Sequence, residues 1–358
     1  MVFDELWGFF RRNSSGWGSL RRVASTSCGV FIDEIRAFIC YSRFFLFILP
    51  SNLKMMKKIL FFALALAVLA SCGSDYEEQK RLTKAERLRL AKEDSAALKV
   101  GTLPTMDCLP LFLAKEHCLF DTAKADIRLK NFNSQIDCDA ALMKGSIEGN
   151  ATDLVRAERM KRRGYALKYA TATNIGWQFV SNRLSRVTEL KQLNDKMVAM
   201  ARFSATHLLA EMAVDSAKLK KDNVFFVQIN DPNIRLKMLL NNEIDAMLLP
   251  EPQATTARLW KHPVLMDTKQ KDIRLGVVVF REKDLLNKNR KKQYEVFLKG
   301  YNVAVDSINK FGVKHYGDLI MKYMKADKAT IDALPNIKFQ HVSAPREKDL
   351  KVSARLAP

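Results

Sequence analysis

The sequence predicts an α/β protein, and two features of its pattern support that fold class. Short apolar or alternating segments of strand length are separated by helical segments along residues 98–324. Capping residues and glycines stand at several of the expected helix ends. The chain of 358 residues, 48% of them hydrophobic, can bury the core of one large domain or two ordinary ones. In such a fold, ligands bind at the carboxyl ends of the strands.

A signal segment precedes the predicted fold. Lys57-Lys58 begins it, an unbroken apolar run follows from Ile59 to Leu69, and small residues then lead to Cys72. This composition is typical of a secretory signal, and the run is too short to span a membrane. The end Leu69-Ala70-Ser71-Cys72 also resembles the lipobox of bacterial lipoproteins, which implies cleavage before Cys72 and lipidation of that residue. We therefore expect an exported protein that is lipid-anchored to a membrane, at its periplasmic face or the cell surface. The alternative is an apolar segment that happens to end in cysteine.

Residues 1–54 stand in front of this signal, where a basic start would normally be close to the N-terminus. The simplest interpretation is a mis-assigned start codon, so that residues 1–54 are not translated and synthesis begins at residue 55 or 56. Residues 55–71 then form the signal peptide, and residues 72–97 form a tether and a spacer helix. That helix is expected from Leu82 to Leu98, with Thr83 as its N-cap and Glu86 completing a capping box.

The net charge of +20 raises the question of a nucleic-acid partner. Residues 1–58 hold five of these net charges, so about +15 remains on the retained part. Its densest basic runs, residues 159–163 and 288–292, are interpreted as solvated helix faces, and no basic stripe is interleaved with aromatic residues. We expect no nucleic-acid partner, and a basic surface that faces anionic lipids or steers anionic solutes instead.

The cysteines and histidines give no sign of a catalytic or metal centre. Cys28 and Cys40 precede the predicted cleavage site, which leaves Cys108, Cys118 and Cys138 in the body. One disulfide among these three is allowed, but three small buried hydrophobic residues are the favoured interpretation, and no zinc-site spacing occurs. The five histidines are dispersed, and no P-loop or nucleophile motif is present. We therefore predict no enzyme, with no catalytic residue, metal or cofactor.

The first series of elements alternates strand and helix. Strands are expected at residues 98–103, 126–132, 147–154, 165–171 and 177–181, and helices at 109–119, 138–144 and 155–163. Ser134 is the expected N-cap of the second of these helices, and Gly145 its end.

The second series begins near Leu190. It comprises expected strands at residues 197–201, 223–229, 244–249 and 273–280, and helices at 207–214, 233–240, 291–309 and 316–324.

The order of motifs resembles the substrate-binding proteins of ABC importers for sulfonates, taurine, nitrate and thiamine pyrimidine precursors. The resemblance rests on residues 100–104, 109–115, 132–134, 139–149 and 152–153, and on residues 242–246 and 251–252 later in the chain. It implies a type II periplasmic binding protein fold with two α/β lobes joined by a hinge. The first lobe would comprise residues 98–182 and 275–358, and the second residues 183–274. The implied partners are a small-molecule solute and the permease and ATPase subunits of the importer, with the protein itself a monomer.

Three loop-to-helix junctions are candidate solute contacts, because helix N-termini offer free N–H groups and a partial positive charge to anions. Arg202 with Ser204 and Thr206 is the strongest, since a guanidinium binds oxyanions in bidentate fashion. Its alternative is a solvated arginine beside an ordinary cap. The other two junctions carry Thr102 with Thr105 and, at a position where the family contacts its ligand, Asn133 with Ser134; each serves equally well as a turn or cap.

Four further residues lie near the expected strand ends. Thr152 ends a first-lobe strand, and Asn174 and Trp177 lie near the first crossing between lobes. Trp177 is suited to stacking on a flat solute, although an aromatic residue here is more often core. Glu251 belongs to the Glu251-Pro252 pair that resembles the family's second-lobe signature, and it either contacts a ligand amine or caps the next segment.

Together these features predict a lipid-anchored solute-binding component of an ABC importer for a small organic anion such as a sulfonate, taurine or nitrate. A thiamine pyrimidine precursor is the alternative solute. Two other classes stay open: an enzyme on the same fold that resembles pyrimidine synthases, and a lipoprotein sensor.

Overall fold

The computed structural model describes residues 74–121 and 123–356. The predicted signal peptide, Cys72 and the residues expected not to be translated lie outside this range. Chain contacts divide the molecule into a unit of residues 1–89 and a unit of residues 90–358. Both sheets belong to the second unit. None of the helices in the described ranges is long and apolar enough to cross a membrane.

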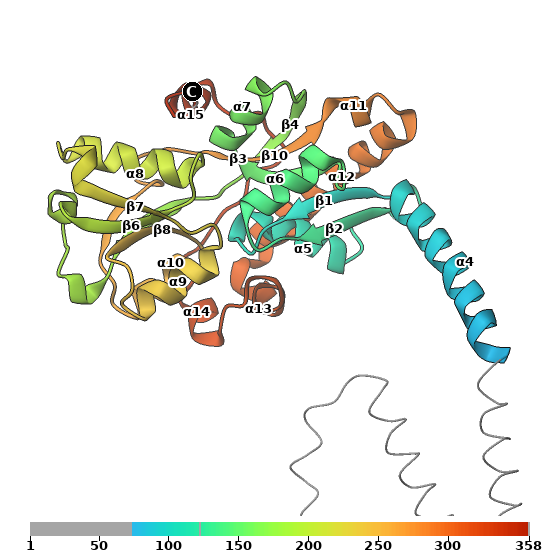
Figure 1. Ribbon diagram of the computed structural model, residues 1–358, viewed down its shortest axis with the longest axis horizontal. Helices are drawn as coiled ribbons and strands as arrows, with labels where there is room; N and C mark the ends of the chain where they lie inside the picture. Colours follow the sequence, from blue (N-terminus) through green and yellow to red (C-terminus); the bar gives the residue numbers. More distant parts are fainter. Residues whose placement is uncertain (1–73, 122, 357–358) are drawn as a thin grey trace, which may run out of the picture. The chain divides into compact units, whose positions relative to one another are not determined.

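Two mixed sheets form the body, so the predicted α/β class is confirmed (Figure 1). The sheet of the first lobe has the order β2-β1-β3-β10-β4, with parallel pairing of β1 to both neighbours and antiparallel pairing of β10. Its strands are β1 (Leu98–Thr102), β2 (Ile127–Asn131), β3 (Gly149–Asp153), β4 (Leu167–Ala172) and β10 (Gly276–Arg281). The sheet of the second lobe has the order β7-β6-β8-β5-β9. Its strands are β5 (Trp177–Ser181), β6 (Lys196–Met200), β7 (Val224–Gln228), β8 (Ala246–Pro250) and β9 (Val264–Asp267).

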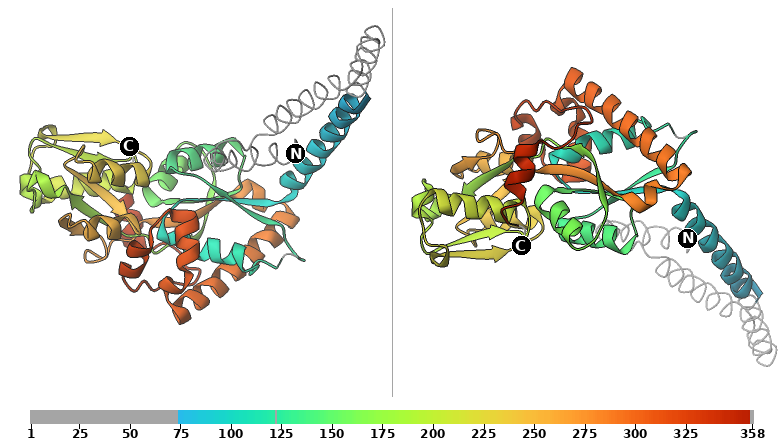
Figure 2. Two further views of the ribbon diagram at one scale, coloured as in Figure 1. Left: turned by 90° about the horizontal axis from the view of Figure 1, so that it is seen from below. Right: turned by 90° about the horizontal axis from the view of Figure 1, so that it is seen from above.

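Helices cover both faces of the first sheet. Figure 2 shows α6 and α7 on one face, and α5 and α12 on the other. The described α-helices are α4 (Ser74–Ala96), α5 (Leu109–Glu116), α6 (Gln135–Lys144), α7 (Leu154–Arg162), α8 (Ala205–Ser216), α9 (Pro232–Leu240), α10 (Gln253–Leu259), α11 (Glu282–Leu285), α12 (Lys288–Phe311), α13 (Gly317–Met324), α14 (Lys328–Ala333) and α15 (Glu347–Ser353).

Local capping chemistry places the ends of these helices. Ser134 accepts a hydrogen bond from the Asp137 amide and starts α6, and Gly145 ends it at a φ of 87°, so both predicted signals are confirmed. Asp153 caps α7 and Ser204 caps α8 in the same way. A side-chain oxygen at such a position satisfies an amide that the helix itself cannot pair. The strand ends and the helix starts are therefore held together at one edge of each sheet.

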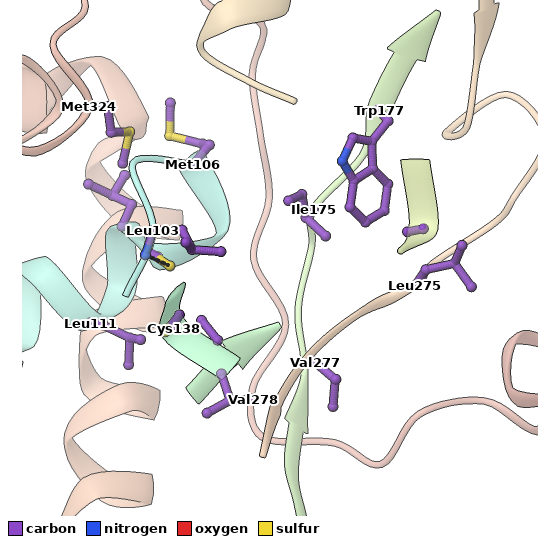
Figure 3. Close-up of a cluster of buried hydrophobic side chains, with 14 of the residues drawn as sticks. Leu103, Met106, Leu111, Cys138, Ile175, Trp177, Leu275, Val277, Val278 and Met324 are labelled. Atoms are coloured by element: carbon purple, nitrogen blue, oxygen red, sulfur yellow. Dashed lines mark hydrogen bonds between the residues drawn. The ribbon is translucent and has the colours of Figure 1, made fainter. Parts of the chain in front are cut away.

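The boundary between lobes differs from the expected residue 182. β5 pairs antiparallel with β8 along Trp177–Ser181, so it belongs to the second sheet and the first crossing lies between β4 and β5. The return crossing lies between β9 and β10. Figure 3 shows Ile175 and Trp177 along the first crossing and Leu275 along the second, and all three are buried. The apolar character of β5 predicts a strand, but it does not specify which sheet the strand joins.

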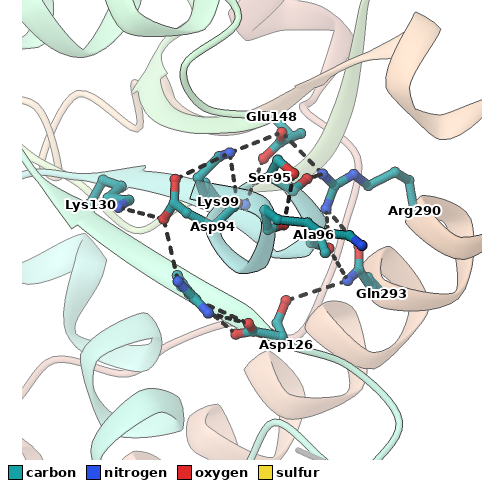
Figure 4. Close-up of polar contacts among 11 residues, drawn as sticks. Asp94, Ser95, Ala96, Lys99, Asp126, Lys130, Glu148, Arg290 and Gln293 are labelled. Carbon is teal, nitrogen blue, oxygen red and sulfur yellow. Dashed lines mark hydrogen bonds and ion pairs between the residues drawn. The ribbon is translucent and has the colours of Figure 1, made fainter. Parts of the chain in front are cut away.

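Polar contacts hold the C-terminus of α4 against the first lobe (Figure 4). Arg290 donates to the carbonyls of Ser95 and Ala96, which have no partner within the helix. Asp94 forms ion pairs with Lys99, Arg128 and Lys130. The chain that follows the spacer helix thus enters the first lobe through a fully bonded junction.

The three cysteines of the body are free. Cys108 and Cys138 are buried, as expected for small core residues, and burial raises the pKa of both thiols well above the ordinary value. Cys118 is exposed, so the expectation of three buried cysteines is wrong for this residue. It follows the C-terminus of α5 in a left-handed conformation with a φ of 52°, which turns the chain out of the core.

The close approach of the two crossing segments leaves no room for a side chain at Gly276. A Cβ atom there would lie 2.1 Å from Thr173 Oγ1 and 2.2 Å from Ile175 Cγ2, both on the other crossing segment. We expect Gly276→Ala to lower the free energy of unfolding by about 1–3 kcal/mol in urea titrations, because the crossings must move apart. Gly317→Ala is the control, since its nearest new contact is a single methyl group at 3.2 Å. An equal cost for both variants would contradict this account of the hinge.

Candidate functional site

A pocket of about 280 Å³ lies between the lobes, and four arginines line it. Arg156 and Arg159 come from α7 of the first lobe and Arg163 is its C-cap residue, whereas Arg202 comes from the loop after β6 in the second lobe. We call this cavity the arginine pocket. Because its walls come from both lobes, a molecule bound there contacts both at once.

Helical spacing explains how α7 presents its arginines. Arg156, Arg159 and Arg163 are separated by three and four residues, so their side chains share one face of the helix. Met160 is buried on that face and also lines the pocket. The basic run that was interpreted as a solvated helix face is therefore partly turned inward, and that interpretation is wrong for Arg159, which is only partly exposed.

The floor of the pocket is a buried ion pair. Arg156 Nη1 lies 2.8 Å from Asp139 Oδ2, and both side chains are less than a tenth exposed. The other Asp139 oxygen accepts hydrogen bonds from Asn150 at 2.6 Å and Thr152 at 3.1 Å, both on β3. Every oxygen of this carboxylate is thus bonded, which holds Arg156 in one place.

Two buried carboxyl groups lie next to each other here, and burial acts on both. It raises the pKa of Asp139, against the opposing effect of Arg156 and the hydrogen bonds from β3. It raises the pKa of Asp153 to about 6, although the Arg156 guanidinium and backbone amides oppose this and favour the charged form. Asp153 also caps α7 through the Arg156 amide at 3.0 Å.

The second lobe contributes an aromatic wall. Phe203 has a left-handed φ of 56°, and the Arg159 guanidinium lies 3.5 Å from the centre of its ring. The Phe203 amide donates to His207 Nδ1 at 3.3 Å, so this nitrogen is unprotonated. Burial lowers the pKa of His207, which agrees with a neutral ring. Phe203 is thus fixed from both sides, by its backbone and by the stacked guanidinium.

Several hydrogen bonds join the lobes directly, and backbone carbonyls accept three of them. Arg156 Nη2 donates to the Arg202 carbonyl at 3.3 Å, Gln253 Nε2 donates to the Pro104 carbonyl at 3.0 Å, and the Met106 amide donates to the Glu251 carbonyl at 2.9 Å. The arrangement is therefore a closed one, in which loops of both lobes touch.

Most of the predicted contact hydroxyls are used locally. Thr102 donates to Asn131 at 2.7 Å, and Thr105 donates to Asp107 at 2.6 Å. Ser204 and Thr206 bond to each other and to the backbone of Ala201. Ser134 bonds to Asp137. Thr152 bonds to Asp139 and so supports the pocket floor.

The four remaining predicted residues lie apart from one another. Asn133 is exposed, and Asn174 donates to the Lys338 carbonyl at the hinge. Trp177 is 3% exposed within the core. Glu251 accepts from Thr255 and pairs with Arg258 at 2.9 Å, so its carboxylate serves α10. Of the predicted contact residues, Arg202 is the one that lines the arginine pocket.

Sequence reasoning missed Asp139, the three arginines of α7, Phe203 as a wall, and Gln228, which also lines the pocket. The spacing of the arginines was a usable signal, since residues 156, 159 and 163 fall on one helix face. Nothing in the sequence around Gln228 distinguishes this residue from the last residue of any other strand.

Comparisons with known proteins agree with the fold and with the export signal. A family model for the prokaryotic membrane lipoprotein lipid attachment site matches residues 56–72. A search of the curated proteins found no match. The ligand-binding component of an ABC-type import system from Staphylococcus aureus, solved with zinc bound, has a TM-score of 0.61 at 19% identity, covering 72% of this chain and 89% of that one.

Two sulfonate-binding proteins are similarly close in structure. The alkanesulfonate-binding protein of Xanthomonas axonopodis pv. citri bound to MOPS has a TM-score of 0.62 at 17% identity, covering 74% of this chain and 94% of that one. The periplasmic aliphatic sulphonate binding protein of Escherichia coli has a TM-score of 0.59 at 18% identity, covering 73% and 85%. The chain therefore has the periplasmic binding protein fold. With its lipid attachment site, it is exported and anchored to a membrane.

The buried ion pair predicts a large stability cost at Asp139. Asp139→Ala leaves the Arg156 charge unpaired inside the protein and removes the acceptor of Asn150 and Thr152. We expect the free energy of unfolding in urea to fall by about 3–5 kcal/mol. Asp121→Ala breaks an exposed ion pair with Lys124 and is expected to change stability little. Similar losses of unfolding free energy in the two variants would show that the Asp139–Arg156 pair does not stabilise the floor of the pocket.

The raised pKa of Asp153 predicts a pH dependence. Folding favours the protonated carboxyl, so its stabilising contribution is full below about pH 4 and is lost as the pH rises through 6. At pH 7.5 the loss is about 3 kcal/mol, from the shift of about two units. Asp153→Asn retains an oxygen for the Arg156 amide but does not ionise.

Urea titrations between pH 4.5 and 7.5 test this, because the wild type should lose about 2 kcal/mol more than Asp153→Asn over that range. Asp272→Asn is the control. Lys348 and Arg346 hold the pKa of Asp272 at about 2, so its stabilising contribution is lost only as the pH falls below about 4. The free energy of unfolding of Asp272→Asn should therefore change with pH in parallel with that of the wild type. A parallel change for Asp153→Asn would refute the raised pKa of Asp153.

Proposed function

We propose that this protein is the lipid-anchored solute-binding component of an ABC importer, and that it captures a small organic anion between its lobes. The single observation that carries the proposal is the arginine pocket, whose walls come from both lobes. Similarity to proteins described as binding aliphatic sulfonates supports the same class of solute. Sulfonate, taurine and nitrate are the first candidates, because guanidinium groups recognise oxyanions.

The proposed mechanism is capture followed by hinge closure. In the open form the contacts from Arg156 to the Arg202 carbonyl and from Gln253 to the Pro104 carbonyl are broken, and water can reach both carbonyls. A solute that bridges Arg202 and the arginines of α7 binds the closed form better and shifts the equilibrium toward it. The permease and ATPase then recognise the closed form, and the protein acts as a monomer.

The alternative solute, a thiamine pyrimidine precursor, has less support. It calls for Trp177 to stack on the ring and for Glu251 to accept from an amine. Trp177 is enclosed in the core, and the Glu251 carboxylate is occupied by Thr255 and Arg258. The enzyme class also has less support, because the structural relatives named above are binding proteins. A sensor differs from an importer component in its gene neighbourhood, where permease and ATPase genes would be lacking.

A thermal-shift screen tests the proposal. The purified lipoprotein in non-ionic detergent is screened against sulfonates, taurine, nitrate and pyrimidines, and we expect an anion to raise the melting temperature. Arg202→Ala should weaken the binding of that anion by about tenfold or more, because one charged hydrogen-bond donor is lost. Lys191→Ala, an exposed change in the same lobe, should leave the affinity unchanged. Stabilisation by no small organic anion, neither these solutes nor the phosphate ester considered below, would contradict the proposal.

A further inference from the structure

The arginine pocket has more positive charge than its carboxylate balances. Asp139 is the acidic residue in its lining, and Arg156 already pairs with it at 2.8 Å. Within the described ranges, no ion pair links a carboxylate to Arg159, Arg163 or Arg202. Three guanidinium groups therefore line one cavity without a counter-charge from the described part of the chain.

These like charges oppose one another. Burial lowers the pKa of Arg159, and the charges of Arg163 and Arg156 lower it further. Arg159 instead stacks on Phe203, whose ring face attracts a cation but carries no net charge. The remaining repulsion is relieved by a bound anion, and each added negative charge relieves more of it.

The rest of the lining limits the size and shape of the ligand. Met143, Met160 and Ile136 provide apolar surface, and Gln228 provides an amide. A volume of about 280 Å³ is at the lower end for ligand sites, so the molecule is compact. It has room for one short apolar group beside its charged head.

We infer that the arginine pocket binds a compact organic anion with at least two negative charges and a short apolar group, of the phosphate monoester class. This inference rests on the proposed function and narrows its solute. The three free guanidiniums suit a tetrahedral dianion, because each phosphate oxygen can accept from a separate arginine. A sulfonate of the same shape offers one charge and leaves the excess largely unbalanced.

The test compares two anions of similar shape. Propyl phosphate is doubly charged at pH 8, since its second pKa is about 6, whereas propane-1-sulfonate carries one charge. Calorimetric titration of the purified lipoprotein should give a dissociation constant about tenfold or more lower for the phosphate. Arg163→Gln and Arg202→Gln should each weaken phosphate binding by about tenfold and sulfonate binding by less.

Arg162→Gln is the matched control, because it removes the same charge from the neighbouring position of α7 without touching the pocket lining. It should leave both affinities within about twofold, as expected for an exposed charge at high dielectric. An equal loss in Arg162→Gln and Arg163→Gln would overturn the site. Equal or tighter binding of the sulfonate would overturn the requirement for two charges and leave the proposed function intact. If neither probe binds while another screened solute does, only this inference fails; if no solute binds at all, the proposed function fails with it.

Discussion

The buried pair of Asp139 and Arg156 is the interaction on which the site depends. One guanidinium bonds to α6 through Asp139 and to the second lobe through the Arg202 carbonyl. The carboxylate is bonded in turn to β3 through Asn150 and Thr152. A charge at this depth is costly unless it is paired and hydrogen-bonded, so each partner fixes the position of the others. The floor of the pocket is therefore rigid, whereas Arg163 and Arg202 at its edge are exposed and adjustable.

The proposed capture of a solute between the lobes needs an interface that can also separate. Three of the direct hydrogen bonds between lobes are accepted by the backbone carbonyls of Pro104, Arg202 and Glu251, which water can satisfy as readily when the lobes part. Arg156 Nε and Gln253 Oε1 are also buried without a partner among the described residues. In the proposed capture, the decisive contribution to closure comes from the solute, which is how ligand binding controls a two-state equilibrium.

Local sequence signals predicted the elements of the fold well, because caps and periodicity act within a few residues. Ser134 and Gly145 begin and end α6 as the sequence pattern indicates, and strands form in the segments of strand periodicity. The lobe boundary was harder, since the apolar run of β5 does not say which sheet it joins. The short helix α10 and strand β9 were missed, because seven and four residues are too few for a clear period. The site was predicted least well. Serine and threonine suit both ligands and caps, and here they serve the caps, whereas the inward face of α7 is set by long-range packing.

The chain from the lipid attachment site enters the first lobe, which also forms most of the arginine pocket. Strand β3 runs from the point of entry to the pocket floor. The chain from the lipid attachment site continues through α4 into β1, where Asp94 and Arg290 bind the junction to the first lobe. Glu148, which directly precedes β3, accepts from the Lys99 amide at 2.7 Å and lies 3.5 Å from Arg290. Thr152, at the far end of the same strand, bonds to Asp139. One five-residue strand thus spans from the tether junction to the pocket floor. The membrane tether therefore acts through the lobe that contributes three of the four arginines. The second lobe, which contributes Arg202 and Phe203, is connected to the first by the two hinge crossings and by direct hydrogen bonds such as that from Arg156 to the Arg202 carbonyl.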